Sequence, residues 1–502
     1  MAEASLFEPR GDYVDGRFRL PPAPTGEIRL EDPGDTSTEL GAFPFAAGSV
    51  DEAVESARRA WPAWRDADPA ERAARLERLG ELIDAESERL AGAIAREVGK
   101  PLWEARTEVA AMVGKVRITL EDGLDLVRER ALEPAAGQVA RWRAHARGVL
   151  AVLGPFNFPG HLVHGHVVPA LATGNSVVIK PSDRTPAVGQ LYAELLHRAE
   201  FPPGVVSTVQ GDGGSGARLA AHPDVAGVLF TGSWAVGRRI LEATLDQPGK
   251  LVALEMGGKN AALVCDDADL DAAVYAVAFG AAVTAGQRCS ATSRAILAAS
   301  IADEFTYKLT RVLSRIAVGY PLDDGVFMGP LISADARERH ARVLAWARDE
   351  GAECLLAGGP CEGPRPGHYV RPSLHRVASA ASESRYQAEE HFVPDLFLLR
   401  VDDLDAAIAA LNDTRYGLVG SVFTRDRARF ERVWRESRLG LLNWNASTVG
   451  ASSRLPFGGI GQSGNDRAAG VTSTLYCTYP VASLEVEAPG APTAPPGFPW
   501  PL

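Results

Sequence analysis

Val149-Leu150-Ala151-Val152-Leu153-Gly154-Pro155 is the stretch of this 502-residue chain that decides the fold. Five consecutive apolar residues that stop at Gly-Pro predict a strand that is buried on both faces. Three similar runs follow it at Ser176–Lys180, Val205–Val209 and Gly227–Phe230, and helical sequence separates all four. Buried strands that alternate with helices predict a parallel, doubly wound sheet, which is an α/β fold.

The regions on either side of these strands extend the same pattern. Before them, Ala, Arg, Glu and Leu recur with helical spacing, and we expect Asp51 to cap one helix and Pro69 or Ala70 to begin another. After them, strands and helices alternate again from residue 256 to about residue 460. The sequence therefore predicts a second α/β domain.

The composition is that of a globular enzyme and argues against several other classes. Hydrophobic residues make up 46% of the chain and charged residues 23%. The net charge of −12 argues against nucleic-acid binding, and no apolar run approaches the roughly twenty residues needed to cross a membrane. Met1–Ala4 lacks the basic and apolar regions of a signal peptide, and five scattered cysteines fit free thiols. We therefore expect a cytoplasmic protein with no nucleic-acid or membrane partner.

Two reactive side chains indicate covalent chemistry. Cys289 stands in Gly286-Gln287-Arg288-Cys289-Ser290, and Glu255 stands in Leu254-Glu255-Met256-Gly257-Gly258-Lys259. A thiolate is a strong nucleophile, and a carboxylate can activate water. If the two meet in one cleft, the chain can form a covalent intermediate and then hydrolyse it. The alternative for Glu255 is a strand residue that pairs with a buried cation.

Polar residues at two strand ends indicate a nucleotide site, because ligands bind at the carboxyl edge of an open parallel sheet. Lys180 and Asp183 follow the second strand, where they could hold ribose hydroxyls or phosphate. The fourth strand runs through Thr231–Gly237 into a helix whose free N–H groups could face a pyrophosphate. Gly211–Gly216 contains a G-x-G-x-x-G match, but such a match alone is weak and more often marks a plain connection than a phosphate loop.

A histidine cluster, His161, His164 and His166, has spacing that a metal site could use. No carboxylate or cysteine beside it completes a usual ligand set. We therefore expect packing or substrate contacts from these histidines, and no metal site.

Seven motifs, in this order along the chain, resemble those of the NAD(P)-dependent aldehyde dehydrogenases. The resemblance covers roughly residues 40–485. Its motifs are Pro155-Phe156-Asn157-Phe158-Pro159, Lys180-Pro181-Ser182-Asp183, Phe230-Thr231-Gly232-Ser233, Leu254-Glu255-Met256-Gly257-Gly258-Lys259, Gly286-Gln287-Arg288-Cys289, Glu390-His391-Phe392 and Pro456-Phe457-Gly458-Gly459.

The resemblance implies the oxidation of an aldehyde to a carboxylic acid. Cys289 would attack the aldehyde carbon and then hold the acyl group as a thioester. Asn157 would donate its side-chain amide to the oxyanion, and Glu255 would activate the water that releases the acid.

The resemblance also implies a dinucleotide cofactor. Lys180 would contact the adenine-side ribose, Ser233 the pyrophosphate and Glu390 the nicotinamide ribose. The lysine motif of the family usually ends in Glu, and the charge of Asp183 would likewise repel a 2′-phosphate, so we expect NAD rather than NADP. Val393 stands where the family has glycine, which restricts the backbone beside Glu390. The expected cofactor-binding residues are Lys180, Asp183, Gly232, Ser233, Gly237, Glu390 and Phe392.

Three stretches resemble, within this family, the succinylglutamate semialdehyde dehydrogenases of arginine catabolism. They are Asn157–His161 with Gly165-His166, Asn443-Trp444-Asn445, and Gly450–Ser453 leading to Ser463-Gly464-Asn465. The expected substrate is therefore an acidic semialdehyde such as N-succinylglutamate semialdehyde, whose carboxylates could meet backbone N–H groups and an arginine at Gly450–Arg454. The expected substrate-binding residues are Phe156, Arg288, Ser290, Gly450, Ala451, Arg454 and Phe457.

Two alternatives stay open at this point. One is a broader aliphatic or glutamate-semialdehyde dehydrogenase. The other is a catalytically silent member of the family that serves as a nucleotide-binding or structural protein.

The fold that the resemblance implies has a Rossmann-like cofactor domain, an α/β catalytic domain and a small β bridging element. The bridging element would join subunits, so we expect a homodimer or a homotetramer. The predicted parts are an NAD-binding domain at 1–125 and 148–255, a catalytic domain at 256–469, an oligomerisation element at 126–147 and 470–487, and a Pro-rich tail at 488–502.

Overall fold

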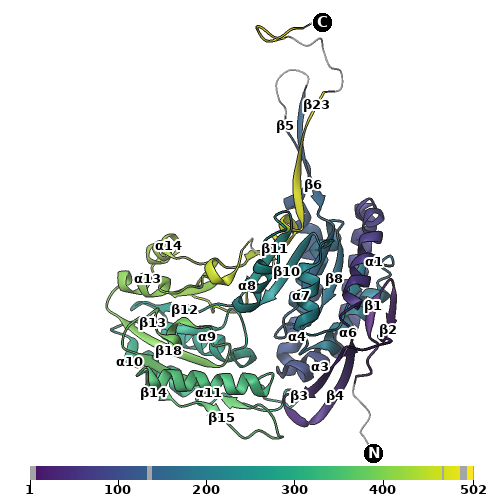
Figure 1. Cartoon of the computed structure of the whole chain (residues 1–502). Helices are drawn as coiled ribbons and strands as arrows, with labels where there is room; N and C mark the ends of the chain where they lie inside the picture. Colours follow the sequence, from purple (N-terminus) through teal and green to yellow (C-terminus); the bar gives the residue numbers. More distant parts are fainter. Residues whose placement is uncertain (1–6, 133–137, 466–467, 487–493, 501–502) are drawn as a thin grey trace, which may run out of the picture.

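The computed structural model describes residues 7–132, 138–465, 468–486 and 494–500. Two seven-stranded sheets, each covered by helices, stand beside one another, and a three-stranded sheet extends away from them (Figure 1). Each large sheet has its own apolar layers on both faces. The predicted α/β fold with two such units is confirmed.

The first large sheet, here called the N-terminal sheet, has the strand order β11-β10-β7-β8-β9-β1-β2. It is parallel from β11 to β9 and ends in an antiparallel β1–β2 hairpin. Its strands are β1 (Asp12–Val14), β2 (Arg17–Arg19), β7 (Val149–Leu153), β8 (Ser176–Lys180), β9 (Val206–Thr208), β10 (Gly227–Gly232) and β11 (Leu251–Met256). All four predicted strands are present, the third shorter and the fourth two residues longer than predicted.

Helices cover both faces of the N-terminal sheet. Apolar side chains of α1, α7 and α8 pack on one face, and those of α2 to α6 pack on the other. The helices are α1 (Ser49–Arg65), α2 (Pro69–Ala85), α3 (Ser87–Val98), α4 (Leu102–Ile118), α5 (His161–Ala172), α6 (Pro186–Arg198), α7 (Gly213–Ala221) and α8 (Trp234–Ala243).

The two expected helix starts have different outcomes. Pro69 begins α2, and the side chain of Asp68 accepts a hydrogen bond from the N–H of Ala70, so that prediction is confirmed. The prediction that Asp51 caps α1 is wrong, because the helix begins at Ser49 and Gly48 is its N-cap. The Asp51 carboxylate lies in the first turn and pairs with Arg218 of α7 instead.

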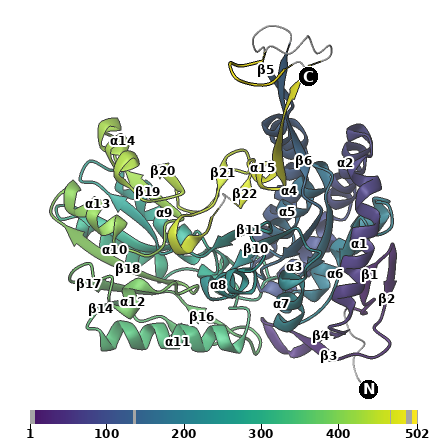
Figure 2. The same cartoon turned by 45° about the horizontal axis from the view of Figure 1, so that its top comes forward.

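The second large sheet, the C-terminal sheet, has the strand order β14-β17-β18-β13-β12-β19-β20 and is parallel except for β14 at its edge (Figure 2). Helices α9 and α10 pack on one face, and α11, α13 and α14 pack on the other. The strands are β12 (Asn260–Val264), β13 (Thr292–Ala298), β14 (Glu353–Leu356), β17 (Ser373–Val377), β18 (Asp395–Val401), β19 (Val419–Phe423) and β20 (Leu441–Trp444). The helices are α9 (Leu270–Ala282), α10 (Ala302–Leu313), α11 (Ala334–Asp349), α12 (Arg385–Ala388), α13 (Leu404–Asn412) and α14 (Arg427–Glu436).

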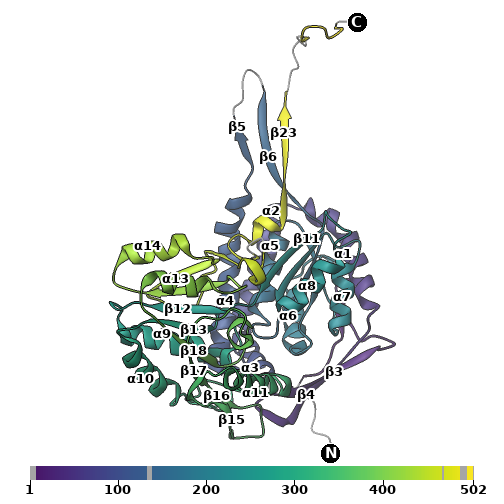
Figure 3. The same ribbon diagram turned by 60° about the vertical axis from the view of Figure 1, so that its left-hand side comes forward.

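The three-stranded sheet, in the order β23-β6-β5, extends away from both large sheets (Figures 1 and 3). Its antiparallel strands are β5 (Arg130–Leu132), β6 (Val139–Ala146) and β23 (Thr478–Glu485). Arg141 and Arg143 of β6 pair with Glu129 and Glu485 across it. The domain boundaries and the oligomerisation role stay predictions.

The remaining elements include a β-hairpin of β3 (Gly26–Asp32) and β4 (Asp35–Phe45). The others are short: the strands β15 (Gly359–Pro360), β16 (Val370–Arg371), β21 (Pro456–Phe457) and β22 (Ala469–Gly470), and the helix α15 (Ser473–Tyr476). The single turns are η1 (Thr119–Gly123), η2 (Leu124–Val127), η3 (Val283–Gly286) and η4 (Gly461–Ser463). Of the Pro-rich tail predicted at 488–502, only 494–500 is described, and the rest lies outside the described residues. No helix in the described part of the chain is long and apolar enough to cross a membrane.

Candidate active site

A cavity of about 520 Å³ lies at the carboxyl ends of the N-terminal sheet, and loops of the C-terminal sheet together with α11 line its other side. It brings together residues that are far apart in the sequence. The residues expected from the sequence that line it are Phe156, Asn157, Lys180, Asp183, Gly232, Ser233, Glu255, Cys289, Glu390 and Phe392.

Cys289, Glu255 and Asn157 share one end of this cavity. Cys289 lies in the loop between η3 and β13, and its side chain is partly exposed. Asn157 follows β7, is almost fully buried, and donates from Nδ2 to the carbonyl of Gln287 at 2.9 Å. An amide nitrogen carries two hydrogens, so the second N–H of Asn157 can serve an oxyanion at Cys289.

Glu255 is fully buried at the end of β11, yet among the described residues neither carboxylate oxygen accepts a hydrogen bond of normal geometry. Burial raises the pKa of Glu255 to about 8; the nearby Cys289 thiol lowers it, while the charge of Glu390 raises it further. Burial also raises the pKa of the Cys289 thiol well above its usual range, and the charges of Glu255 and Glu390 act in the same direction. Burial therefore opposes a negative charge on either group, and a charge on one opposes a charge on the other.

The backbone before the cysteine is in an unusual conformation. Thr284, Ala285 and Gly286 have φ angles of 55°, 51° and 69° in succession. A side chain at Gly286 would overlap the backbone carbonyl of Val393, so the loop needs glycine there. Left-handed Thr and Ala residues cost free energy and persist only where other contacts hold them.

Glu104 of α4 supplies those contacts. Its fully buried carboxylate accepts hydrogen bonds from the N–H of Thr284 at 3.1 Å, from the Thr284 hydroxyl, and from Nη2 of Arg288 at 2.8 Å. Burial alone would raise the pKa of Glu104, but the guanidinium of Arg288 and the ammonium of Lys100 outweigh burial and lower it. A charged Glu104 thus holds the loop that presents Cys289.

The next turn of α4 holds the loop that carries Asn157. Nζ of Lys100 donates to Oε2 of Glu108 at 2.7 Å, with both side chains fully buried. Oε1 of Glu108 accepts from the N–H groups of Gly160 and His161 at 2.9 and 3.0 Å, and Lys100 also sits 3.7 Å from the Phe158 ring centre. We call Lys100, Glu104, Glu108, Thr284 and Arg288 the Glu104 network. It ties the loop of Cys289 and the loop of Asn157 to one helix, α4.

The other end of the cavity lies over β8, α7 and α8. Lys180 is largely buried, and burial lowers its pKa against the opposing charges of Asp183 and Asp212. Ser233 caps α8 through a bond from the N–H of Val236 at 3.4 Å. A cation, a carboxylate and a helix N-terminus along one cavity fit the phosphates and hydroxyls of a dinucleotide.

Glu390 lies between these two ends. Its Oε1 accepts the N–H of Gly258 at 3.2 Å, and a side chain at Gly257 would overlap its carboxylate. Burial raises the pKa of Glu390 to about 7, while the Gly258 N–H and the cations Arg339 and Lys259 oppose that rise. Phe392 has a φ of 55° and packs edge-on against Phe156, with ring centres 5.8 Å apart.

Seven of the expected site residues do not line this cavity. Gly237 of α8 packs against Met256, and the Arg288 guanidinium pairs with Glu104. Arg454 is exposed and pairs with Asp122 at 3.3 Å. The others are Ser290, which is buried, Phe457, which is half-buried, and the exposed Gly450 and Ala451. Their substrate and cofactor roles stay predictions.

Other residues that line the cavity were not expected from the sequence. Arg239 and Arg339 lie on α8 and α11, where the arginines of a helical stretch look like a solvated face. Gly213 and Gly216 come from the G-x-G-x-x-G match, which begins α7 at the cavity. The weak glycine pattern was the one available indication of the last two.

Two histidines of the cluster, His164 and His166, contact tyrosine hydroxyls. Nδ1 of His164 lies 2.8 Å from the Tyr192 hydroxyl, and Nδ1 of His166 lies 2.8 Å from the Tyr476 hydroxyl. In the described part of the chain, no group of three or more His, Cys, Asp or Glu side chains is arranged to hold a metal ion.

Comparison with known proteins agrees with this geometry. A model described as the aldehyde dehydrogenase family matches residues 22–481. The N-succinylglutamate 5-semialdehyde dehydrogenase of Novosphingobium aromaticivorans is 42% identical over 445 residues, which are 88% of this chain and 93% of that protein. The protein with the same name in Chromobacterium violaceum is 40% identical over 488 residues, 96% of this chain and 97% of that protein.

Solved structures are similar over nearly the whole length. A putative aldehyde dehydrogenase from Burkholderia cenocepacia has a TM-score of 0.90 and 35% identity, covering 96% of this chain and 98% of that chain. The structure of PnpE in complex with nicotinamide adenine dinucleotide has a TM-score of 0.91 and 34% identity, covering 96% of this chain and 99% of that chain.

Proposed function

The chain belongs to the aldehyde dehydrogenase family, whose members are oxidoreductases that act on aldehydes, and on this premise we propose that it oxidises N-succinylglutamate 5-semialdehyde with NAD. The observation that carries the chemistry is the meeting of Cys289, Glu255 and Asn157 at one end of a cavity whose other end suits a dinucleotide. The substrate rests on the names of relatives that are 39–42% identical over most of the chain.

The proposed reaction uses this chain's residues in two stages. Cys289 loses its proton to Glu255, and Sγ attacks the aldehyde carbon, while the free N–H of Asn157 meets the oxyanion. A bound nicotinamide would supply the acceptor for the hydride that leaves the former aldehyde carbon. Cys289 then holds the acyl group as a thioester, and Glu255 releases the proton that it took from Cys289 to solvent. The ionised Glu255 next takes a proton from water, which attacks the thioester and releases the acid and the thiolate of Cys289.

NAD is proposed over NADP because of Asp183. Its carboxylate stands at the carboxyl end of β8, where a 2′-phosphate on the adenine-side ribose would meet a like charge. PnpE, which is similar over nearly its whole length, binds nicotinamide adenine dinucleotide.

A broader aliphatic aldehyde dehydrogenase is the second candidate. The observation that favours it is Arg454, whose exposed guanidinium pairs with Asp122 and does not line the cavity. An acidic substrate would therefore have to find its cations elsewhere or displace Asp122.

A panel of aldehydes with NAD decides between these candidates. We expect kcat/KM for N-succinylglutamate 5-semialdehyde to exceed that for neutral aliphatic aldehydes by at least about a hundredfold, because ion pairing with a carboxylate is absent from the neutral compounds. A preference for neutral aldehydes would favour the second candidate.

Cys289→Ala tests the nucleophile in the same assay. It should abolish NADH formation and leave NAD binding intact, since the thiol acts on the substrate. Cys354→Ala, at an exposed cysteine outside the cavity, is the matched control and should keep full activity. A wild type that makes no NADH from any aldehyde, with a thiol that resists alkylation, would indicate a catalytically silent protein.

A further inference from the structure

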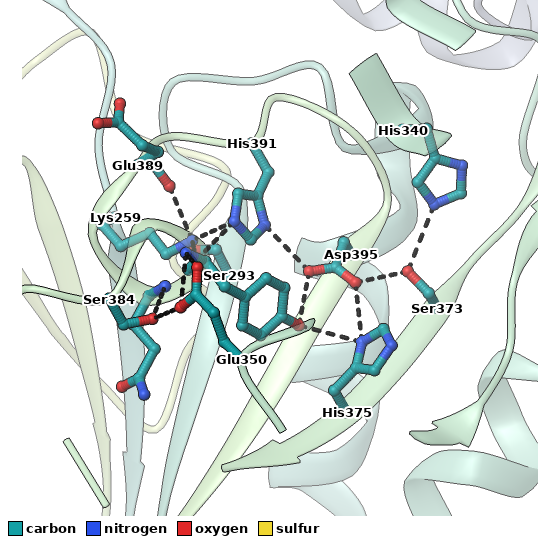
Figure 4. Close-up of polar contacts among 12 residues, drawn as sticks. Lys259, Ser293, His340, Glu350, Ser373, His375, Ser384, Glu389, His391 and Asp395 are labelled. Atoms are coloured by element: carbon teal, nitrogen blue, oxygen red, sulfur yellow. Dashed lines mark hydrogen bonds and ion pairs between the residues drawn. The ribbon is translucent and has the colours of Figure 1, made fainter. Parts of the chain in front are cut away.

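A second buried polar network links Lys259, His391 and Asp395 (Figure 4). It joins the loop between β11 and β12 to the loop between α12 and β18, and reaches α11. We call it the Lys259 network: Lys259, His340, Ser373, His375, Tyr386, His391 and Asp395, all of them at most 4% exposed.

Lys259 contacts the chain on both sides of Glu390. Its Nζ donates to the carbonyl of Glu389 at 2.8 Å and to the carbonyl of Tyr386 at 3.0 Å, and lies 2.9 Å from Nε2 of His391. The residue before Lys259 is Gly258, whose N–H donates to the Glu390 carboxylate. One short loop thus holds the Glu390 side chain directly and both of its neighbours through Lys259.

His391 is itself held by Asp395. Nε2 of His391 lies 2.9 Å from Nζ of Lys259 and 2.7 Å from the carbonyl of Tyr386, and Nδ1 lies 3.0 Å from Oδ2 of Asp395. The Asp395 carboxylate also accepts from Tyr386 Oη at 2.9 Å and from Ser373 Oγ at 2.5 Å. The imidazole of His391 thus links the amine of Lys259 to the carboxylate of Asp395.

The Lys259 network continues toward Arg339, a cation that lines the cavity. The Ser373 hydroxyl lies 3.3 Å from Nε2 of His340 on α11. The residue before His340 is Arg339, which lines the cavity with Glu390. The chain of contacts thus runs from Glu390 to Arg339.

This arrangement holds a loop that is strained. Phe392 has a left-handed φ, and Val393 follows it where the family pattern has glycine. A strained backbone persists only where its surroundings fix it. A buried lysine and aspartate add less stability than well-packed apolar side chains of the same volume, so their contacts point to a positional role.

We propose that Lys259 is a positioning residue, which fixes the Glu390 carboxylate at the cofactor cavity and is itself held by His391 and Asp395. Lys259 does not line the cavity and touches neither Cys289 nor Glu255, so its effect passes through Glu390. The proposal rests on the proposed function in one respect: Glu390 is taken to contact the ribose next to the nicotinamide.

A double-mutant cycle with Lys259→Met and Glu390→Gln tests this. Single-turnover NADH formation should fall about ten- to a hundredfold in Lys259→Met, because misplacing a group by about 1 Å costs up to that much. In the Glu390→Gln background the same change should cost less than about twofold, since its target is already gone. The affinity for NAD, followed by tryptophan fluorescence without any aldehyde, should show the same non-additivity.

Two further readouts separate positioning from a general structural role. Hydrolysis of 4-nitrophenyl acetate needs the Cys289 nucleophile and no NAD, so Lys259→Met should leave it within about twofold. Lys250→Met is the matched control, because Nζ of Lys250 also donates to two backbone carbonyls, those of Ala220 and His222. It should change neither NAD affinity nor NADH formation.

Equal losses in both Glu390 backgrounds, or an equal loss of ester hydrolysis, would overturn the proposal. If Lys259→Met does not fold, His391→Phe keeps the ring stacked on Tyr386 and removes the link to Asp395. The same cycle with Glu390→Gln then gives the answer. A wild type that oxidises no aldehyde would sink the proposed function, while the NAD-affinity cycle would still decide the role of Lys259.

Discussion

The Glu104 network and the Lys259 network support the same cavity in different ways. The first holds four charges, from Lys100, Glu104, Glu108 and Arg288, and ties a helix of the N-terminal sheet to the loop before β13 of the C-terminal sheet. The second pairs Lys259 with Asp395 through an imidazole and lies within the C-terminal sheet and its loops.

The two networks differ in whether the remaining charged groups keep partners when one residue is removed. Among the described residues, Glu104 is the one ion-pair partner of Arg288, and it also holds the left-handed backbone at Thr284. Asp395 keeps donors from Ser373, Tyr386 and His375 when the link to Lys259 is lost. Loss of the first network should therefore destabilise the protein and misplace Cys289, while loss of the second should act on cofactor handling.

Glu104→Ala gives the largest expected effect. Removing one partner of a buried ion pair leaves an uncompensated charge on Arg288, which costs about 3–5 kcal/mol of unfolding free energy. Urea denaturation measures this loss, and hydrolysis of 4-nitrophenyl acetate should fall with it because Cys289 loses its support. Glu88→Ala on the neighbouring helix α3, whose exposed carboxylate pairs with Arg106, is the control and should lose far less. Equal losses in the two variants would remove the distinction between a buried and an exposed partner.

These two networks also mark the limit of what the sequence predicts. β7 and β8 have the predicted bounds because five apolar residues and a Gly-Pro or Pro stop are local information. Cys289, Glu255 and Asn157 were chosen on motifs that are equally local. Asn157 and Glu255 meet because strand ends of one parallel sheet share an edge, whereas Cys289 comes from the loop before β13 of the other sheet.

No local sequence pattern predicts the long-range contacts of these networks. Arg288 stands beside the nucleophile and was therefore expected to bind substrate, but its partner is Glu104, 184 residues away. Lys259 lies in a glycine-rich motif and was given no role, because its acceptors are backbone carbonyls that no side-chain pattern indicates. The sequence predicts that Asp51 caps a helix, but its carboxylate pairs with an arginine of another helix.

Glu255 belongs to neither network, and its titration gives the next largest effect. Its carboxylate must be ionised to take a proton from water, and its pKa is raised to about 8. The rate of thioester hydrolysis should therefore rise about tenfold per pH unit below pH 8 and level off above it. Rapid-mixing measurements of the steady phase that follows an NADH burst test this. Glu255→Gln should remove the slope, and a wild type with a flat profile between pH 6 and 8 would contradict the assignment.

The smallest effect is expected at an exposed ion pair that, like the Glu104 network, joins the parts of the molecule built on the two large sheets. Nη2 of Arg184, in the loop after β8, pairs with Oδ2 of Asp335 in the first turn of α11 at 3.0 Å. This pair joins the same two sheets as Glu104 and Arg288, but its side chains are 48% and 79% exposed.

Water screens an exposed pair, and fixing two mobile side chains opposes its attraction, so the coupling energy in an Arg184→Ala and Asp335→Ala cycle should be about 0–1 kcal/mol. Urea denaturation of the four proteins gives this value, and added salt should reduce it further. Hydrolysis of 4-nitrophenyl acetate should not change in any of them, since neither residue touches the loop of Cys289. A coupling as large as that of the buried pair would mean that the connection between the sheets, and not burial, gives Glu104 its importance.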